Sequence, residues 1–219
     1  MTQPGQSMTT QLAPVADISD PLHITVGNPD LKPSFTQTAM VNFSDFNQAS
    51  QRSIFAMMHA SYTSNDIVSR TLTDAVTGVR TTTYTNVSGN WQLMAMGMLT
   101  QPFRNRSWRF NANLRSSYNS AAGFINGERN RSGNLQIAPS AGLTFTSEIF
   151  QMTLGPSYSL QVASASLPSQ PTRTIHAYGF NADAALYLPF GLELQTDLSM
   201  SRNTGYSSGF NSDQWLWNA

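Results

Sequence analysis

The stretch WRFNANLRSSY, residues 108–118, alternates between apolar and polar side chains without a break in its first eight residues. A period of two is typical of a β-strand, in which successive side chains point to opposite faces. One face would carry Trp108, Phe110, Ala112 and Leu114, and the other would carry Arg109, Asn111, Asn113 and Arg115. A face with two arginines and two asparagines needs water. The stretch therefore predicts a strand between an apolar medium and a wet one.

The same division recurs along the chain in segments of about ten residues, the length of a transmembrane β-strand. Nine such segments are expected: 34–43, 53–63, 90–100, 108–118, 134–146, 150–161, 173–188, 192–201 and one that begins at Trp215. Their connections alternate in length. Short turns are expected near 45–47, 101–107, 148 and 189–191, and long polar loops at 64–86, 119–131, 163–172 and around Gly205 and Gly209. This pattern predicts an all-β antiparallel up-and-down meander of about nine strands in a transmembrane β-barrel.

Composition agrees with a membrane β protein and excludes several other classes. Charged residues make up 11% of the 219 residues and the net charge is zero, whereas a soluble domain carries about a quarter charged residues. We therefore expect no nucleic-acid partner and no capture by an anionic surface. There is no cysteine, and the longest apolar run, Leu93–Leu99, is far shorter than the roughly 18 residues of a membrane helix. Any membrane-spanning part must be built from strands.

Aromatic residues fall into two groups, as the two girdles of an outer-membrane barrel do. Beside the short turns lie Phe43, Phe46, Phe103, Trp108, Phe145, Phe150, Tyr187 and Phe190. Beside the long loops lie Tyr62, Tyr84, Tyr118, Tyr158, Tyr178, Tyr206 and Trp215. A general preference of aromatic residues for strands is the alternative explanation.

Two of the expected strands lack a clean polar face. Segment 90–100 sets Leu93 and Ala95 against three methionines, and segment 53–63 sets Phe55 and Met57 against Ile54 and Met58. Two explanations are open. Either the lumenal side of these strands packs against something inside the barrel, or these are ordinary strands buried on both sides.

The segment ahead of the first strand carries a recognisable motif. Asn28-Pro29-Asp30-Leu31-Lys32-Pro33 resembles the N-P-x-L-K-P-E motif of TonB-dependent outer-membrane receptors, found where an extracellular loop enters a barrel strand. The chain departs from the motif at Ser34, where the family has glutamate. Further similarity to the receptor-like barrels of Bacteroidetes lies at 20–27, 62–67 and 214–219, so the resemblance covers about residues 11–219.

The resemblance implies a specific place in a larger protein. Residues 1–33 would be an extracellular loop segment leading into the barrel. Residues 34–219 would form part of the barrel, incomplete at both ends, and the whole barrel would have about 22 strands. It also implies an N-terminal plug domain, the energy-coupling protein TonB, outer-membrane lipid and an unknown large solute as partners. Met1–Thr10 has neither the basic nor the apolar region of a secretory signal, so this chain is expected to be a piece of a longer one.

No catalytic or metal constellation stands out, so we expect neither an enzyme nor a cofactor. His23, His59 and His176 lack metal-ligand spacing. The candidate lumen-facing residues are Arg109, Arg115, Asp183, Glu193 and Asp197, which could contact a plug, line a solute path or form an ion-pair ladder. Glu193 and Asp197 would lie about 13 Å apart along a strand, too far for a glycosidase pair.

Three functions are consistent with the sequence. A TonB-dependent uptake receptor agrees best with the motif. A barrel that works without TonB, such as a porin or an adhesin, shares the strand pattern. A secreted β-sandwich that binds glycans would also alternate, because one face of each of its strands is buried.

Overall fold

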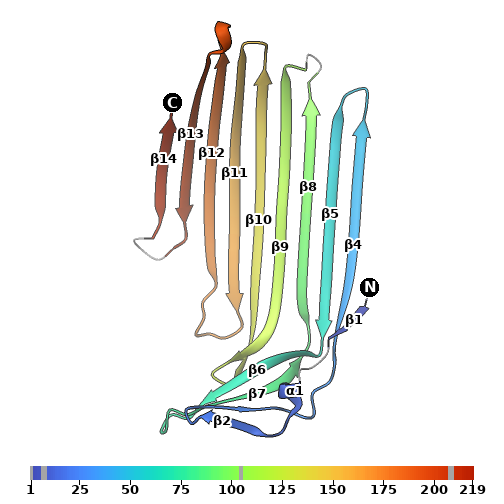
Figure 1. The fold of residues 1–219 in the computed structure, drawn as a ribbon, viewed down its shortest axis with the longest axis vertical. Helices are drawn as coiled ribbons and strands as arrows, with labels where there is room; N and C mark the ends of the chain where they lie inside the picture. Colours follow the sequence, from blue (N-terminus) through green and yellow to red (C-terminus); the bar gives the residue numbers. More distant parts are fainter. Residues whose placement is uncertain (1, 6–8, 104–105, 207–209) are drawn as a thin grey trace.

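A computed structural model describes residues 2–5, 9–103, 106–206 and 210–219, and it is almost entirely β (Figure 1). Nine long strands, each antiparallel to the next, run up and down in one sheet, which confirms the predicted meander. They are β4 (Ser34–Asn47), β5 (Arg52–Ser64), β8 (Asn90–Pro102), β9 (Trp108–Ile125), β10 (Glu128–Thr146), β11 (Phe150–Ala165), β12 (Arg173–Tyr187), β13 (Glu193–Thr204) and β14 (Ser212–Asn218). The short strand β1 (Thr2–Gly5) adds a tenth member beside the start of β4.

The connections are short at one end of this sheet and long at the other. The upper end in Figure 1 holds the short turns, including a single 3-10 turn, η1, at Pro189–Gly191. The predicted turn 101–107 and the loop around Gly209 fall partly outside the described residues, at 104–105 and 207–209.

A second, four-stranded sheet lies at the end of the long connections. It has the order β2 (Ala16–Asp20), β3 (His23–Val26), β7 (Arg80–Val87) and β6 (Asp66–Thr73), and a one-turn helix, α1 (Thr9–Leu12), precedes it. Residues 64–86 were predicted as a long polar connection with a turn of its own at Thr77-Gly78. The turn is present, with a positive φ of 73° at Gly78, but the connection is not an irregular loop, because β6 and β7 form a hairpin there. Strand β3 pairs with β7 in parallel, from His23 beside Arg80 to Val26 beside Thr83. The segment ahead of the first barrel strand thus shares a sheet with the hairpin between β5 and β8.

Strands β9 and β10 extend well past the length needed to cross a membrane. They contain 18 and 19 residues, and the predicted loop at 119–131 is instead their projecting hairpin. Its turn is Asn126-Gly127, with positive φ angles of 49° and 81°. An Asn-Gly pair accepts these angles readily and matches the twist of a two-residue hairpin. Ten-residue strands cross the membrane, so the remainder of both strands lies beyond it.

The long sheet is a single layer with no packed core. Among the described residues no side chain is fully buried, and the buried apolar ones are Leu31, Val87 and Ala122, all at the long-loop end. A β-sandwich would bury one face of every strand against a second sheet, so that alternative is excluded. In the described part of the chain, no helix is long and apolar enough to cross a membrane.

The sheet stays open within the described residues. Strand β14 pairs only with β13, and β1 covers only Ser34–Gln37 of β4. From Ala39 onward, the outer edge of β4 is paired with no other strand in the described part of the chain. Open edges of this length in lipid would leave backbone polar groups unpaired, so the wall needs neighbouring strands to be stable there.

The aromatic residues cluster near the two ends of the sheet, although not every one lies on the apolar face. Near the short turns the ring centroids of Trp108 and Phe145 are 4.8 Å apart, and near the long loops those of Tyr62 and Trp91 are 4.7 Å apart. Three residues depart from the expectation. By register, Phe46 and Tyr187 lie on the polar face, and Tyr84 belongs to β7 in the small sheet.

Candidate functional site

The polar face of the long sheet is continuous across the strands, and we call it the inner wall. Directly opposite residues on neighbouring strands share a face. The register therefore extends one row from Arg109 through Thr144, Thr153 and Asp183 to Asp197. Arg115 and Glu193 lie on the same face, an even number of residues from Arg109 and Asp197. All five candidate lumen-facing residues thus share the inner wall.

The charges on this wall are held by amides rather than by opposite charges. Asp183 accepts a hydrogen bond from Asn181 at 3.0 Å, and Asp197 accepts one from Asn218 at 2.9 Å. Arg109 is three strands from Asp183, about 14 Å at the usual strand spacing. Within the described residues none of the five candidates forms an ion pair, so the ion-pair ladder is not formed there.

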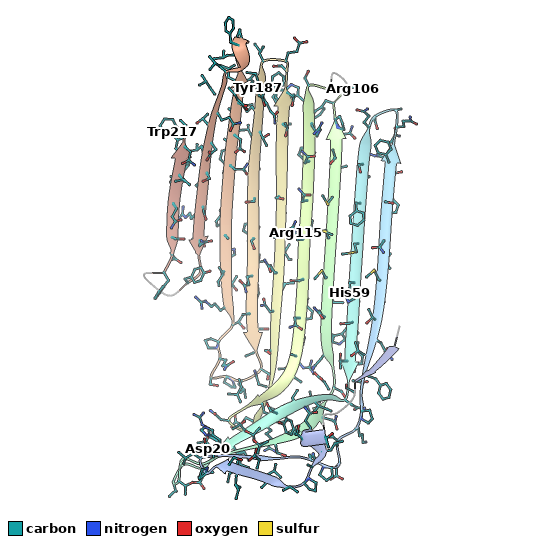
Figure 2. The ribbon with its side chains drawn as sticks, viewed as in Figure 1. Asp20, His59, Arg106, Arg115, Tyr187 and Trp217 are labelled. Carbon is teal, nitrogen blue, oxygen red and sulfur yellow. The ribbon has the colours of Figure 1, made fainter. Side chains whose placement is uncertain are left out.

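Two of the carboxylates repel each other. Asp183 and Asp197 are directly opposite across β12 and β13, where like charges are destabilising. Their placement is compatible with water on this side of the sheet, because bulk water screens such a pair far better than an apolar core. The inner wall is therefore a hydrated surface. Its positive charges on β9 and its negative charges on β12 and β13 are separated across the sheet and do not pair. Arg115, one of the positive charges, is labelled in Figure 2.

The opposite face of the sheet exposes large apolar side chains, although some of them contact one another, as the rings of Tyr62 and Trp91 do. Its exposed members include Val41, Phe43, Met58, Trp91, Leu114, Tyr118, Tyr178, Leu194 and Trp215. A monomer in water rarely exposes so large an apolar area, whereas a lipid-facing barrel wall requires it. We call this face the outer wall.

The motif Asn28-Pro29-Asp30-Leu31-Lys32-Pro33 forms the junction between the small sheet and β4. The Asn28 amide donates to the carbonyl of Tyr84 at 2.9 Å, and its oxygen accepts from the backbone N–H of Asp30 at 3.0 Å. The side chain of Leu31 is buried. Pro29 and Pro33, which cannot donate a backbone hydrogen bond, frame this segment just before β4 begins at Ser34.

Asn86, which the sequence did not single out as a site residue, holds the junction closed. Its oxygen accepts from the backbone N–H of Lys32 at 2.7 Å, and its amide donates to the carbonyl of Lys32 at 2.9 Å. The same amide donates to the carbonyl of Asn65 at 2.8 Å. One side chain therefore replaces a pair of strand hydrogen bonds and joins the entry segment to the β5–β6 corner.

A second set of contacts ties the β9–β10 hairpin to the small sheet. Arg131 donates to the carbonyls of Gly89 and Ser88 at 2.6 and 3.2 Å. The guanidinium of Arg70 on β6 lies 5.4 Å from the ring centroid of Phe124 on β9, a cation–π distance. The Gly89 and Ser88 partners of Arg131 are more than 40 residues away in the sequence, and no local pattern reveals a contact of that kind.

Three aspartates at the long-loop end have lowered pKa values, each through local hydrogen bonds. The backbone N–H groups of Thr77 and Val76 lower the pKa of Asp74, and the hydroxyl and backbone N–H of Ser19 lower that of Asp17. For Asp20 the backbone N–H of Leu22 is the first cause and His23, 2.7 Å away, the second. These carboxylates stabilise turns and have no geometry for catalysis.

The three histidines are far apart in the structure. His23 pairs with Asp20, and His176 contacts the hydroxyl of Tyr158 at 2.8 Å on the outer wall. His59 lies on the inner wall of β5, opposite Met40 and Met94 (Figure 2). No group of three or more His, Cys, Asp or Glu side chains that could hold a metal ion occurs among the residues that the structure describes.

A single-layer antiparallel sheet with a hydrated inner wall, a lipid-facing outer wall and one end of long connections defines an outer-membrane β-barrel protein. Residues 7–170 match the outer membrane protein beta-barrel family, and the chain belongs to this family. The protein is therefore located in the outer membrane. No curated protein and no solved structure matches it significantly.

Proposed function

We propose that this chain forms part of the wall of a TonB-dependent receptor that takes up a large solute or nutrient across the outer membrane. The observation that carries the proposal is the receptor-like motif at 28–33, together with its position. It lies between the small sheet at the long-loop end and the first residue of a wall strand, where the receptor family has it.

The open sheet supports a wide barrel. Eight strands already suffice to close a small barrel, whereas the nine long strands here do not bring β4 and β14 together among the described residues. A wider barrel agrees with this open sheet, and the barrels of about 22 strands have a plugged lumen, whereas porins of about 16–18 strands have an open channel. A bacterium of the Bacteroidetes is the source that the resemblance favours.

The second candidate is a barrel that works without TonB, such as a porin or an adhesin. It shares the two walls and the loop asymmetry, but it has no plug and no TonB-binding segment. The two candidates therefore differ in what they bind on the periplasmic side, and binding can be measured without knowing the solute.

The test uses the full-length protein purified in detergent and the purified periplasmic domain of TonB from the same organism. We expect the two to bind, and we expect deletion of the N-terminal segment ahead of the plug to abolish binding while the barrel stays folded. A folded barrel that fails to bind TonB, or that binds equally well without that segment, would refute the receptor and favour the porin or adhesin.

A further inference from the structure

Methionines gather on the inner wall of three neighbouring strands. By register, Met40 of β4 and Met94 of β8 are each directly opposite His59 of β5. Met57 of β5 is directly opposite Met96 of β8 in the next row. Met98 extends the series by one more position on β8. Five of the ten methionines of the chain therefore lie in one patch, which we call the thioether patch and which has a histidine at its edge.

The large apolar side chains on the inner wall of these strands are the methionines and two phenylalanines, Phe46 and Phe55. On the inner wall of these strands there is no Leu, Ile or Val, whereas the outer wall of the same strands carries Val41, Ile54 and Leu93. Apolar contact alone is served at least as well by aliphatic side chains, which have better-defined rotamers than methionine. The thioethers are also accessible, since Met40 is 59% exposed and Met94 44% exposed. Exposure also rules out the explanation that these strands are buried on both sides.

The row Met40–His59–Met94 places a thioether side chain on each side of an imidazole, on three neighbouring strands. Directly opposite residues have Cβ atoms about 4.5–5.5 Å apart, so both thioethers flank the imidazole within the reach of their side chains. Methionine has three rotatable bonds and can turn its sulfur toward a shared ligand. Thioether sulfur is a soft ligand that selects Cu(I), and imidazole suits copper as well.

We propose that Met40, His59 and Met94 bind Cu(I) on the inner wall of the barrel. The sequence spacing of the three histidines predicts no metal site, because that reasoning considers imidazole and carboxylate ligands but not thioethers. Met57 and Met96 lie one row further, about 6.7 Å along the strands, but Arg115 is directly opposite Met96, so the cation is assigned to the His59 row alone.

The charge around the patch permits a monovalent cation. The nearest inner-wall arginine is Arg115, directly opposite Met96. Its backbone is about 12 Å from that of His59 at the usual strand spacings, beyond the screening length of roughly 8 Å at physiological salt. The other neighbour of the row is Ser117, which is uncharged and lies opposite Met94. The proposed Cu(I) site depends on the inner wall facing water, and it does not depend on the protein being coupled to TonB.

The test measures Cu(I) affinity of the full-length protein in detergent, without oxygen, with ascorbate to keep copper reduced and a chromogenic Cu(I) chelator as competitor. The variants are Met40→Leu, Met94→Leu and His59→Gln, each of which keeps the approximate size of the side chain. Met58→Leu is the matched control, because Met58 is adjacent to His59 in sequence and lies on the outer wall. Heat-dependent migration on gels verifies that each barrel is folded.

We expect one tightly bound Cu(I) with sulfur and nitrogen neighbours by X-ray absorption, a loss of affinity of about tenfold or more in each of the three variants, and no change in Met58→Leu. If folded Met40→Leu and Met94→Leu barrels keep the original affinity, the patch is only an apolar contact for a plug and the proposal is wrong. Equal loss in Met58→Leu, or no Cu(I) bound by the unaltered protein, overturns it as well.

Discussion

Replacing Leu114 by arginine tests the assignment of the two walls. Leu114 lies on the outer wall of β9, is 45% exposed, and its strand neighbours are Gly97 and Pro139, which cannot shield a charge. From Trp108 to Tyr118 the strand runs about 33 Å, or about 25 Å across the membrane at the tilt typical of barrels, so Leu114 lies near the midplane. Arginine there should cost about 2–4 kcal/mol, which lowers the folding equilibrium constant about 30- to 1,000-fold.

The adjacent residue provides the control. Asn113 is on the inner wall, and Asn113→Arg adds a charge to water, so we expect little loss. The assay is reversible refolding of the full-length protein into lipid vesicles, followed in urea. Arginine placed in turn along the outer wall, at 108, 110, 112, 114 and 116, should give a penalty that peaks near 114 and falls toward the membrane surface. A flat profile, or equal damage at Asn113, would refute the assignment.

Three further predictions concern the long-loop end. Asn86→Ala removes the side-chain bonds to two backbone segments and should destabilise the junction by about 1–2 kcal/mol, seen as faster proteolysis of the loop end while the wall stays protease-resistant. Because the pKa of Asp74 lies below its usual 3.8 in the folded state, its stabilising effect on the β6–β7 tip is complete above that value and is lost as the pH falls through the lowered pKa. The protection factors of the tip amides, which compare each exchange rate with the intrinsic rate at the same pH, should fall only in acid, and in Asp74→Ala they should not change over the same pH range. In intact cells that express the full-length protein, epitope tags at Gly127 or Ser169 should bind antibody and a tag at Pro189 should not; the reverse labelling would invert the topology.

Alternation predicted the wall strands because the side-chain period of a strand is a local property of the sequence. It failed where strands are polar on both faces. Residues 80–87, RTTTYTNV, are rich in β-branched threonine, yet their polarity suggested a loop. Their partner in the parallel pairing, β3, is more than 50 residues away, and no local pattern encodes such a pairing. The polar strand ends around the Asn126-Gly127 turn were also missed, because residues 119–131 were predicted as a loop.

The site residues divide in the same way. The face of Arg109 or Asp183 follows from counting along a strand, and the register confirms that they share a wall. The thioether patch requires more, because Met40, His59 and Met94 become neighbours only when the offsets of three strands are known. The sequence indicated only that two strands lack a clean polar face. The register showed which residues of neighbouring strands lie side by side on that face.

The absence of a fully buried side chain among the described residues has a consequence for how this wall tolerates substitution. In a packed core, shortening a leucine leaves a cavity, and much of the cost comes from neighbours that cannot close it. Lipid chains are fluid and fill such a space at once, so trimming Leu194 or Val41 on the outer wall should cost only the transfer of the lost methyl groups. The size of an outer-wall side chain can therefore change at little cost over evolution, whereas the bilayer requires that the side chain remain apolar.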